Sequence, residues 1–166
     1  MADLVCARDG WFLSRDYDFL LFSKRCGTLE WERGFRPRAL AETGETAWWI
    51  ERRGLGAGHA MLVPGAATNV ATVRRRLFRS TAIVLADGRT YEWGRARAFS
   101  LRLSYGIRHG GEELLGFREE GSFWQNRVRI HVGPASLRGL TPHDRAILIV
   151  LGTYLYLSAR RQQAWA

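Results

Sequence analysis

The sequence predicts a mainly β protein, a closed antiparallel barrel of about 10–12 strands around a buried hydrophobic C-terminal helix. Two observations support this. Between residues 11 and 132, short aromatic and β-branched stretches alternate with polar residues, and Gly or Asp-Gly turns recur about every ten residues, which is typical of sandwiches and barrels. One long apolar run follows, Ala146–Leu157, which has no charge and no polar face.

The apolar run indicates the architecture, because a helix that is apolar on every side must be surrounded. Its twelve residues would reach only about 18 Å as a helix, short of the roughly 30 Å of a bilayer core. We therefore expect the protein itself to enclose this segment. A barrel of about ten or more strands has a bore that short side chains cannot fill, and one apolar helix would fill it. Gly152 would let a strand or a large aromatic side chain approach the helix closely.

The residues that flank the run favour a helix over 142–161. Thr141 can cap free backbone N–H groups, and Pro142 suits the first helical position. Asp144 suits the positive end of the helix dipole, and the pair Arg160-Arg161 suits the negative end.

A rival arrangement turns the same run into two buried strands, Ile147–Leu151 and Tyr154–Leu157, joined at Gly152-Thr153. The Ile and Val content supports it. The capping signals and the uninterrupted length favour the helix.

The predicted strands are short and are separated by turn residues. The clearest unit is a hairpin around Asp87-Gly88, a dipeptide that tolerates the positive φ angles of a tight turn. Another turn is predicted at His109–Glu112. Strict alternation in Arg127–Val132 indicates one wet face and one buried face. In chain order, the predicted strands are Trp11–Leu13, Asp18–Ser23, Thr28–Arg33, Ala47–Arg52, Ala60–Val63, Asn69–Arg75, Phe78–Ala86, Arg89–Trp93, Ala98–Tyr105, Glu113–Arg118 and Asn126–Val132.

Composition predicts one domain over residues 1–166, with 46% hydrophobic and 25% charged residues and no linker or repeat. Cys6 and Cys26 form no C-x-x-C pair, and the four histidines are widely spaced, so we expect neither a metal nor another cofactor. The N-terminal residues lack a basic region followed by an apolar one, which predicts a cytoplasmic protein without a transmembrane span.

Catalytic signatures are absent from the sequence. It contains no Gly-x-Ser-x-Gly motif, no phosphate-binding loop and no His-Glu-x-x-His helix. Gly54–Gly58 lacks the spacing of a dinucleotide-binding loop and is interpreted as a turn. We therefore expect a protein that is not an enzyme. An enzyme whose residues meet only in the folded chain stays an alternative.

The charge indicates an anionic partner. The formal net charge is +9, and 24 of the 25 basic residues are arginines, a bias that genomic composition also explains. The best local candidate for anion binding is the run Arg74, Arg75, Arg76 and Arg79, whose guanidinium groups match phosphate oxygens. The alternative is that these arginines only protect a strand edge.

Trp48-Trp49, beside Arg52-Arg53, fits stacking on a base or a position at a membrane interface. An ordinary strand with one Trp facing in and one facing out explains this pair as well.

The strand series ending in Arg127–Val132, the hairpin Phe78–Trp93 and the bordered helix Ala146–Leu157 resemble the tubby C-terminal-like superfamily, which includes tubby proteins, phospholipid scramblases and LURP-one-related proteins. The resemblance covers nearly the whole chain and concerns architecture. It implies a roughly twelve-stranded barrel threaded by a C-terminal helix, binding of anionic lipid head groups, and a cytoplasmic location that can be peripheral at the membrane. The chain is shorter than usual tubby domains, and no ligand-binding residue can be transferred to it.

Other functions stay open at this stage. A C-terminal membrane anchor would present a cytoplasmic β domain, although Arg145–Ala159 would span only about 22 Å as a helix. Binding of nucleic acid or another polyanion is suggested by the charge alone.

Overall fold

The computed structural model describes residues 3–8, 16–32, 38–44, 46–53, 58–75, 81–95, 104–120 and 127–163. Twelve strands and two helices lie in these ranges. The strands are β1 (Asp3–Arg8), β2 (Tyr17–Leu21), β3 (Lys24–Trp31), β4 (Arg38–Thr43), β5 (Thr46–Arg53), β6 (Gly58–Leu62), β7 (Asn69–Arg75), β8 (Thr81–Leu85), β9 (Thr90–Arg95), β10 (Ser104–His109), β11 (Glu112–Glu120) and β12 (Arg127–Val132). The helices are α1 (Pro134–Gly139) and α2 (Pro142–Gln163).

Eleven of these strands, β2 to β12, form one antiparallel sheet in chain order, and this sheet is not closed by itself. In the described part of the chain, β2 and β12 are not paired with each other. The N-terminal strand β1 lies between them and pairs with both, since Leu4 is opposite Ile130 on β12 and opposite Leu21 on β2. The ring of twelve strands is closed only through β1.

The prediction of a barrel closed by residues 11–132 was therefore wrong. Those residues form the open eleven-stranded sheet, and the strand that joins its two edges precedes them. The sequence of β1, Asp-Leu-Val-Cys-Ala-Arg, has four successive apolar residues and no alternation, a pattern that does not distinguish a buried strand from a buried helical segment. Its pairing partners determine its conformation instead.

Two further elements were not predicted. β4, with the sequence Arg-Ala-Leu-Ala-Glu-Thr, consists largely of good helix formers, yet it is a strand because β3 and β5 pair with it on both sides. α1 begins directly after Gly133, with Pro134 in its first turn. The predicted strand Trp11–Leu13 and residues 98–103 of another lie outside the described residues.

Two predicted turns are confirmed. Gly88 has a φ of +89°, and the backbone N–H of Arg89 donates to Asp87 Oδ1 at 3.0 Å. The turn between β10 and β11 contains Gly110 and Gly111, whose φ angles are +59° and +85°. Both turns need the backbone freedom of glycine.

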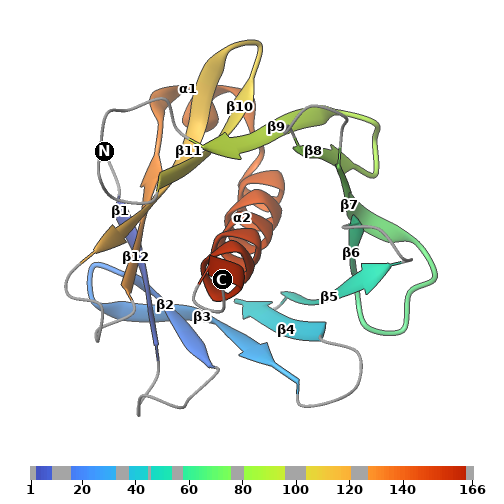
Figure 1. Cartoon of the computed structure of the whole chain (residues 1–166), viewed down its shortest axis with the longest axis horizontal. Helices are drawn as coiled ribbons and strands as arrows, with labels where there is room; N and C mark the ends of the chain where they lie inside the picture. The colour runs from blue at the N-terminus through green and yellow to red at the C-terminus, as the bar shows by residue number, and fades with distance from the viewer. Residues whose placement is uncertain are drawn as a thin grey trace.

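Helix α2 lies in the interior of the sheet (Figure 1). Ile147, Leu151 and Leu155 are 3%, 0% and 7% exposed, and the rival arrangement of two strands is wrong. Trp31 of β3 stacks on Tyr154 of the helix with ring centroids 4.6 Å apart. Each large apolar side chain buried in this way contributes roughly 1.5–3 kcal/mol to stability before entropy. Neither described helix is both long enough and apolar enough to cross a membrane.

The start of α2 is fixed to the β8–β9 turn. Thr141 Oγ1 accepts a hydrogen bond from the backbone N–H of Asp144 at 3.1 Å, which confirms the predicted cap. Arg89 donates to Asp144 Oδ2 at 2.7 Å and to Asp87 Oδ2 at 2.6 Å. Burial raises the pKa of Asp144, but hydrogen bonds from Arg89 and Thr141 outweigh this and hold its pKa below the usual range.

Gly152 allows the closest contact between the helix and the sheet. A Cβ at this position would lie 2.3 Å from Cζ of Phe117, which is 1% exposed on β11. The prediction that Gly152 lets a large aromatic side chain approach the helix is confirmed.

Gly152→Ala should destabilise the protein by about 1–3 kcal/mol, although alanine is the better helix former, because the added methyl group overlaps the Phe117 ring. Chemical denaturation would measure this loss. In a chain that already carries Phe117→Leu, Gly152→Ala should lower the free energy of unfolding by less, because the smaller side chain leaves room for the methyl group. Gly139→Ala is the matched control, since nothing lies within 4 Å of a Cβ there. An unchanged free energy of unfolding for Gly152→Ala would contradict the close contact.

Asp144→Asn should lower the free energy of unfolding at neutral pH by about 1–2 kcal/mol, because the charge-assisted bond to Arg89 is weakened. A carboxyl whose pKa is depressed by folding stabilises the protein above about pH 4 and stops doing so as the pH falls through its folded pKa. Thermal melts across acidic pH should therefore show a smaller loss of Tm for the variant than for the parent chain. Asp87→Asn, at a half-exposed carboxylate, should have the smaller effect.

Candidate anion-binding end of the barrel

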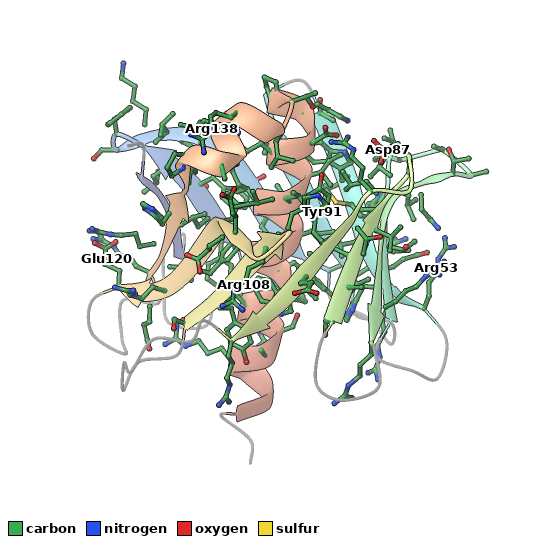
Figure 2. The ribbon with its side chains drawn as sticks, turned by 90° about the horizontal axis from the view of Figure 1, so that it is seen from above. Arg53, Asp87, Tyr91, Arg108, Glu120 and Arg138 are labelled. Carbon is green, nitrogen blue, oxygen red and sulfur yellow. The ribbon has the colours of Figure 1, made fainter. Side chains whose placement is uncertain are left out.

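Arginines gather at the end of the barrel where α2 finishes. β5, β7, β9 and β11 finish at this end and β6, β8, β10 and β12 begin there, as the antiparallel registers show. Figure 2 shows Asp87 and Arg138 at the opposite end. We call this region the basic end; its described arginines on these strands and on α2 are Arg52, Arg53, Arg74, Arg75, Arg95, Arg118, Arg127, Arg129, Arg160 and Arg161.

Three of these arginines occupy positions on the inward face of their strands. Successive side chains of a strand alternate between faces, so a residue two positions after an inward one also lies on the inward face. The last buried inward residues of β5, β7 and β9 are Ile50, Val73 and Trp93, which are 0%, 2% and 6% exposed. The exposed residues Arg52, Arg75 and Arg95 follow these three residues by two positions, where each strand extends past the apolar core.

The last turns of α2 add two more cations to the mouth of the barrel. Arg160 forms an ion pair of 2.7 Å with Glu119 on β11. The guanidinium of Arg161 lies 4.2 Å from the ring centroid of Trp31, a cation–π contact. Cations also suit this position because the C-terminus of a helix is the negative end of its dipole.

The predicted run of arginines does not form a single cluster. Arg74 and Arg75 are both exposed, but they are neighbours on one strand and lie on opposite faces of the sheet. Arg76 and Arg79 lie outside the described residues. The sequence reasoning missed the grouping of Arg75 with Arg52 and Arg95, which come from three different strands. The face of each arginine could be predicted, since each follows a strand's last inward apolar residue by two positions, but the register that groups the three could not.

The basic end keeps an excess of positive charge. Its carboxylates are engaged in ion pairs, Glu51 with Arg53 at 3.0 Å and Glu120 with Arg129. Among the described residues, no acidic partner lies within ion-pair distance of several cations of this end. They are Arg74, Arg75, Arg95, Arg118 and Arg127. At the opposite end, Arg89 is bound by two aspartates.

Aromatic residues line the apolar side of this mouth. Tyr154 and Tyr156 of α2 are 2% and 0% exposed, and Tyr105 meets Tyr156 edge to face at 5.9 Å. Burial, followed by the charge of Glu119, raises the pKa of Tyr156 to about 12. Both tyrosines therefore stay neutral at physiological pH.

The tryptophan pair at 48 and 49 fits the interpretation as an ordinary strand. Trp48 is 1% exposed and faces inward, and its ring lies 6.1 Å from that of His143 near the start of α2. Trp49 is half-buried, and the guanidinium of Arg38 lies 4.4 Å from its ring centroid. Neither ring belongs to the mouth of the barrel.

Within the described ranges, no three His, Cys, Asp or Glu side chains are grouped closely enough to hold a metal ion. Comparison with protein-family models, curated proteins and solved structures finds no match to this chain.

Tyr156 should make the protein more sensitive to alkali. A tyrosine whose pKa is raised by folding stabilises the native state below the unfolded pKa of about 10, and this contribution is lost as the pH rises toward about 12. Tyr156→Phe should therefore flatten the loss of stability over this interval in urea unfolding curves. Tyr91→Phe should flatten the curve as well, since burial also raises the pKa of Tyr91. The interpretation is wrong if parent and Tyr156→Phe lose stability equally.

Proposed function

We propose that this chain is a non-enzymatic, mainly β domain that binds anionic lipid head groups through its basic end, as a protein peripheral to the membrane. The single observation behind the proposal is the convergence of cations from separate strands on one mouth of the barrel. Arg52, Arg75 and Arg95 stand on the inward face there, beside the arginines of α2.

The chemistry of these groups suits phosphate. Guanidinium groups offer planar, forked donors that pair with two oxygens at once, and they keep their charge at every physiological pH. A basic residue near an anionic membrane surface contributes about 1 kcal/mol to binding, so several weak contacts add to a useful affinity. Arg161 on Trp31 also places a flat cation on an aromatic ring at this mouth.

The resemblance to the tubby C-terminal-like superfamily, itself part of this proposal, agrees with this function. It is supported by the enclosure of a C-terminal helix within a sheet of short antiparallel strands. Tubby domains bind phosphoinositides, and scramblases act at membranes.

Co-sedimentation with vesicles tests the proposal. The protein should sediment with phosphatidylcholine vesicles that contain phosphatidylserine, and the bound fraction should fall as salt rises. With pure phosphatidylcholine vesicles the protein should stay in the supernatant. The double substitution Arg75→Gln with Arg95→Gln should weaken binding about thirtyfold, because two charges of about 1 kcal/mol each are removed.

The matched control is Lys24→Gln with Arg138→Gln, which removes two charges at the opposite end and should leave binding nearly unchanged. Equal binding to neutral vesicles, no binding at low salt, or equal losses in both double variants would contradict the proposal. Tighter binding to an oligonucleotide than to vesicles at the same salt would favour a nucleic-acid partner instead.

A further inference from the structure

The outer face of β9, β10 and β11 has a row of three glycines. Gly94, Gly106 and Gly116 are direct partners across these strands, and His131 of β12 continues the row. Adjacent residues of a strand lie on opposite faces, and Ile107 and Phe117, next to two of these glycines, are buried in the core. The glycine row therefore lies on the outer face. Gly116 and His131, the last two members of this row, line a hollow in the sheet surface.

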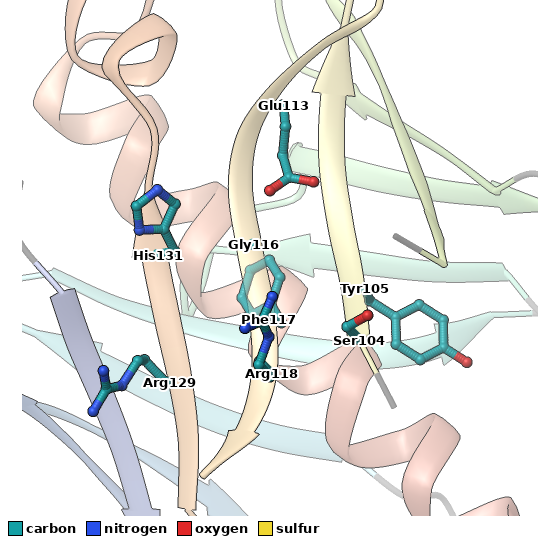
Figure 3. A pocket seen from close by; sticks show the side chains of 8 residues that line it. All are labelled: Ser104, Tyr105, Glu113, Gly116, Phe117, Arg118, Arg129 and His131. Atoms are coloured by element: carbon teal, nitrogen blue, oxygen red, sulfur yellow. The ribbon is translucent and has the colours of Figure 1, made fainter. Parts of the chain in front are cut away.

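The hollow has a volume of about 340 Å³. Glu113, Arg118 and His131 face it from the outer side of the sheet, whereas Tyr105 and Phe117 belong to the inward face. Figure 3 shows the side chains that line it: Ser104, Tyr105, Glu113, Gly116, Phe117, Arg118, Arg129 and His131.

A β-bulge turns Glu113 onto this surface. Ile107 is paired with Leu115 and Arg108 with Glu113, so Leu114 is the extra residue on β11. In a regular strand Glu113 would share the inward face of Leu115; the bulge places it outside instead. Its carboxylate oxygens lie 2.9 Å and 3.0 Å from the positions that a Cβ would occupy on Gly106 and Gly116. The glycines therefore leave the space in which this carboxylate lies.

A cation faces the carboxylate from the other side of Gly116. Arg118 lies two residues farther along β11 on the same face, a rise of about 6.6 Å. Figure 3 shows the two side chains on opposite sides of Gly116, with His131 beside them. Among the described residues, neither Glu113 nor Arg118 has an ion-pair partner. The hydroxyl-bearing residue Ser104 is the direct cross-strand partner of Arg118.

We propose that this hollow binds an aminoalkyl phosphate, a small molecule with a primary ammonium group and a phosphate a few ångströms apart. The ammonium donates to the Glu113 carboxylate, while the phosphate accepts from the Arg118 guanidinium and the Ser104 hydroxyl. Arg129, which is paired with Glu120, lines the same hollow. Such a ligand satisfies both charged groups at once, whereas an anion alone leaves Glu113 next to a like charge.

This site is independent of the proposed function of the basic end. It needs one carboxylate and one guanidinium on the outer face, and it makes no use of Arg52, Arg75 or Arg95. The same chemistry occurs in a free phosphate ester and in the head group of phosphatidylethanolamine, so the experiment includes both.

Calorimetric titration with O-phosphoethanolamine tests the proposal. It should bind at least about tenfold more tightly than ethanolamine, inorganic phosphate or phosphocholine, which lack one of the two groups or the N–H donors. Glu113→Gln and Arg118→Gln should each weaken binding about tenfold or more. Glu112→Gln and Arg138→Gln are the controls, since they remove the same charges outside the hollow.

Several outcomes would overturn the inference: no binding of O-phosphoethanolamine, equal binding of inorganic phosphate, or full affinity in Glu113→Gln when its Tm matches that of the parent. The variant Arg75→Gln with Arg95→Gln should bind O-phosphoethanolamine normally, which separates this site from the basic end. Competition by phosphatidylethanolamine vesicles would support the lipid as the source, and soluble binding without such competition would support a free ester.

Discussion

The enclosure of one fully apolar helix by a sheet is the constraint on which the other features of this chain depend. Leu148, Val150 and Tyr156 have no exposed surface, so every direction around α2 is occupied by protein. The surrounding strands must therefore offer apolar inward residues and still leave room for a helix. Small inward residues such as Ala39 and Ala41 provide space beside large ones such as Trp31, Trp48 and Tyr154. Gly152 continues the same adjustment on the helix, because it admits the Phe117 ring.

The same geometry accounts for the basic end. A strand that extends past the end of the apolar core still alternates its faces, so its next inward residue lies at a wet mouth and not in the interior. On β5, β7 and β9 that residue is an arginine. Like charges gathered at one end raise the energy of the compact state, and a bound anion relieves their repulsion. An arrangement that gains stability from a bound anion is consistent with a binding role, since ligands stabilise the state they prefer.

Features governed by local chemistry could be predicted from the sequence. The cap at Thr141, the turn at Asp87-Gly88, the helical apolar run and the role of Gly152 each depend on residues within a few positions of one another or on one strong pattern. β1 and β4 could not be predicted, because their conformation is determined by strands far away in the sequence. The site shows the same division. The run Arg74–Arg79 can be read directly from the sequence, but adjacent residues of a strand lie on opposite faces, so Arg74 and Arg75 do not act together. The grouping of Arg52, Arg75 and Arg95 requires the register of β5 to β9.

The glycine row is difficult to explain by stability alone. Glycine within a strand costs roughly 0.5–1 kcal/mol relative to alanine, and three in register multiply this cost. The backbone does not require them, since none of the three has a positive φ, and a Cβ at Gly94 would touch nothing within 4 Å. At Gly106 and Gly116 the nearest atoms to an added Cβ belong to Glu113, a side chain that a bulge directs onto this face. At these two positions the missing Cβ leaves the space that the Glu113 carboxylate occupies, which agrees with the proposed binding of an ammonium group at that carboxylate.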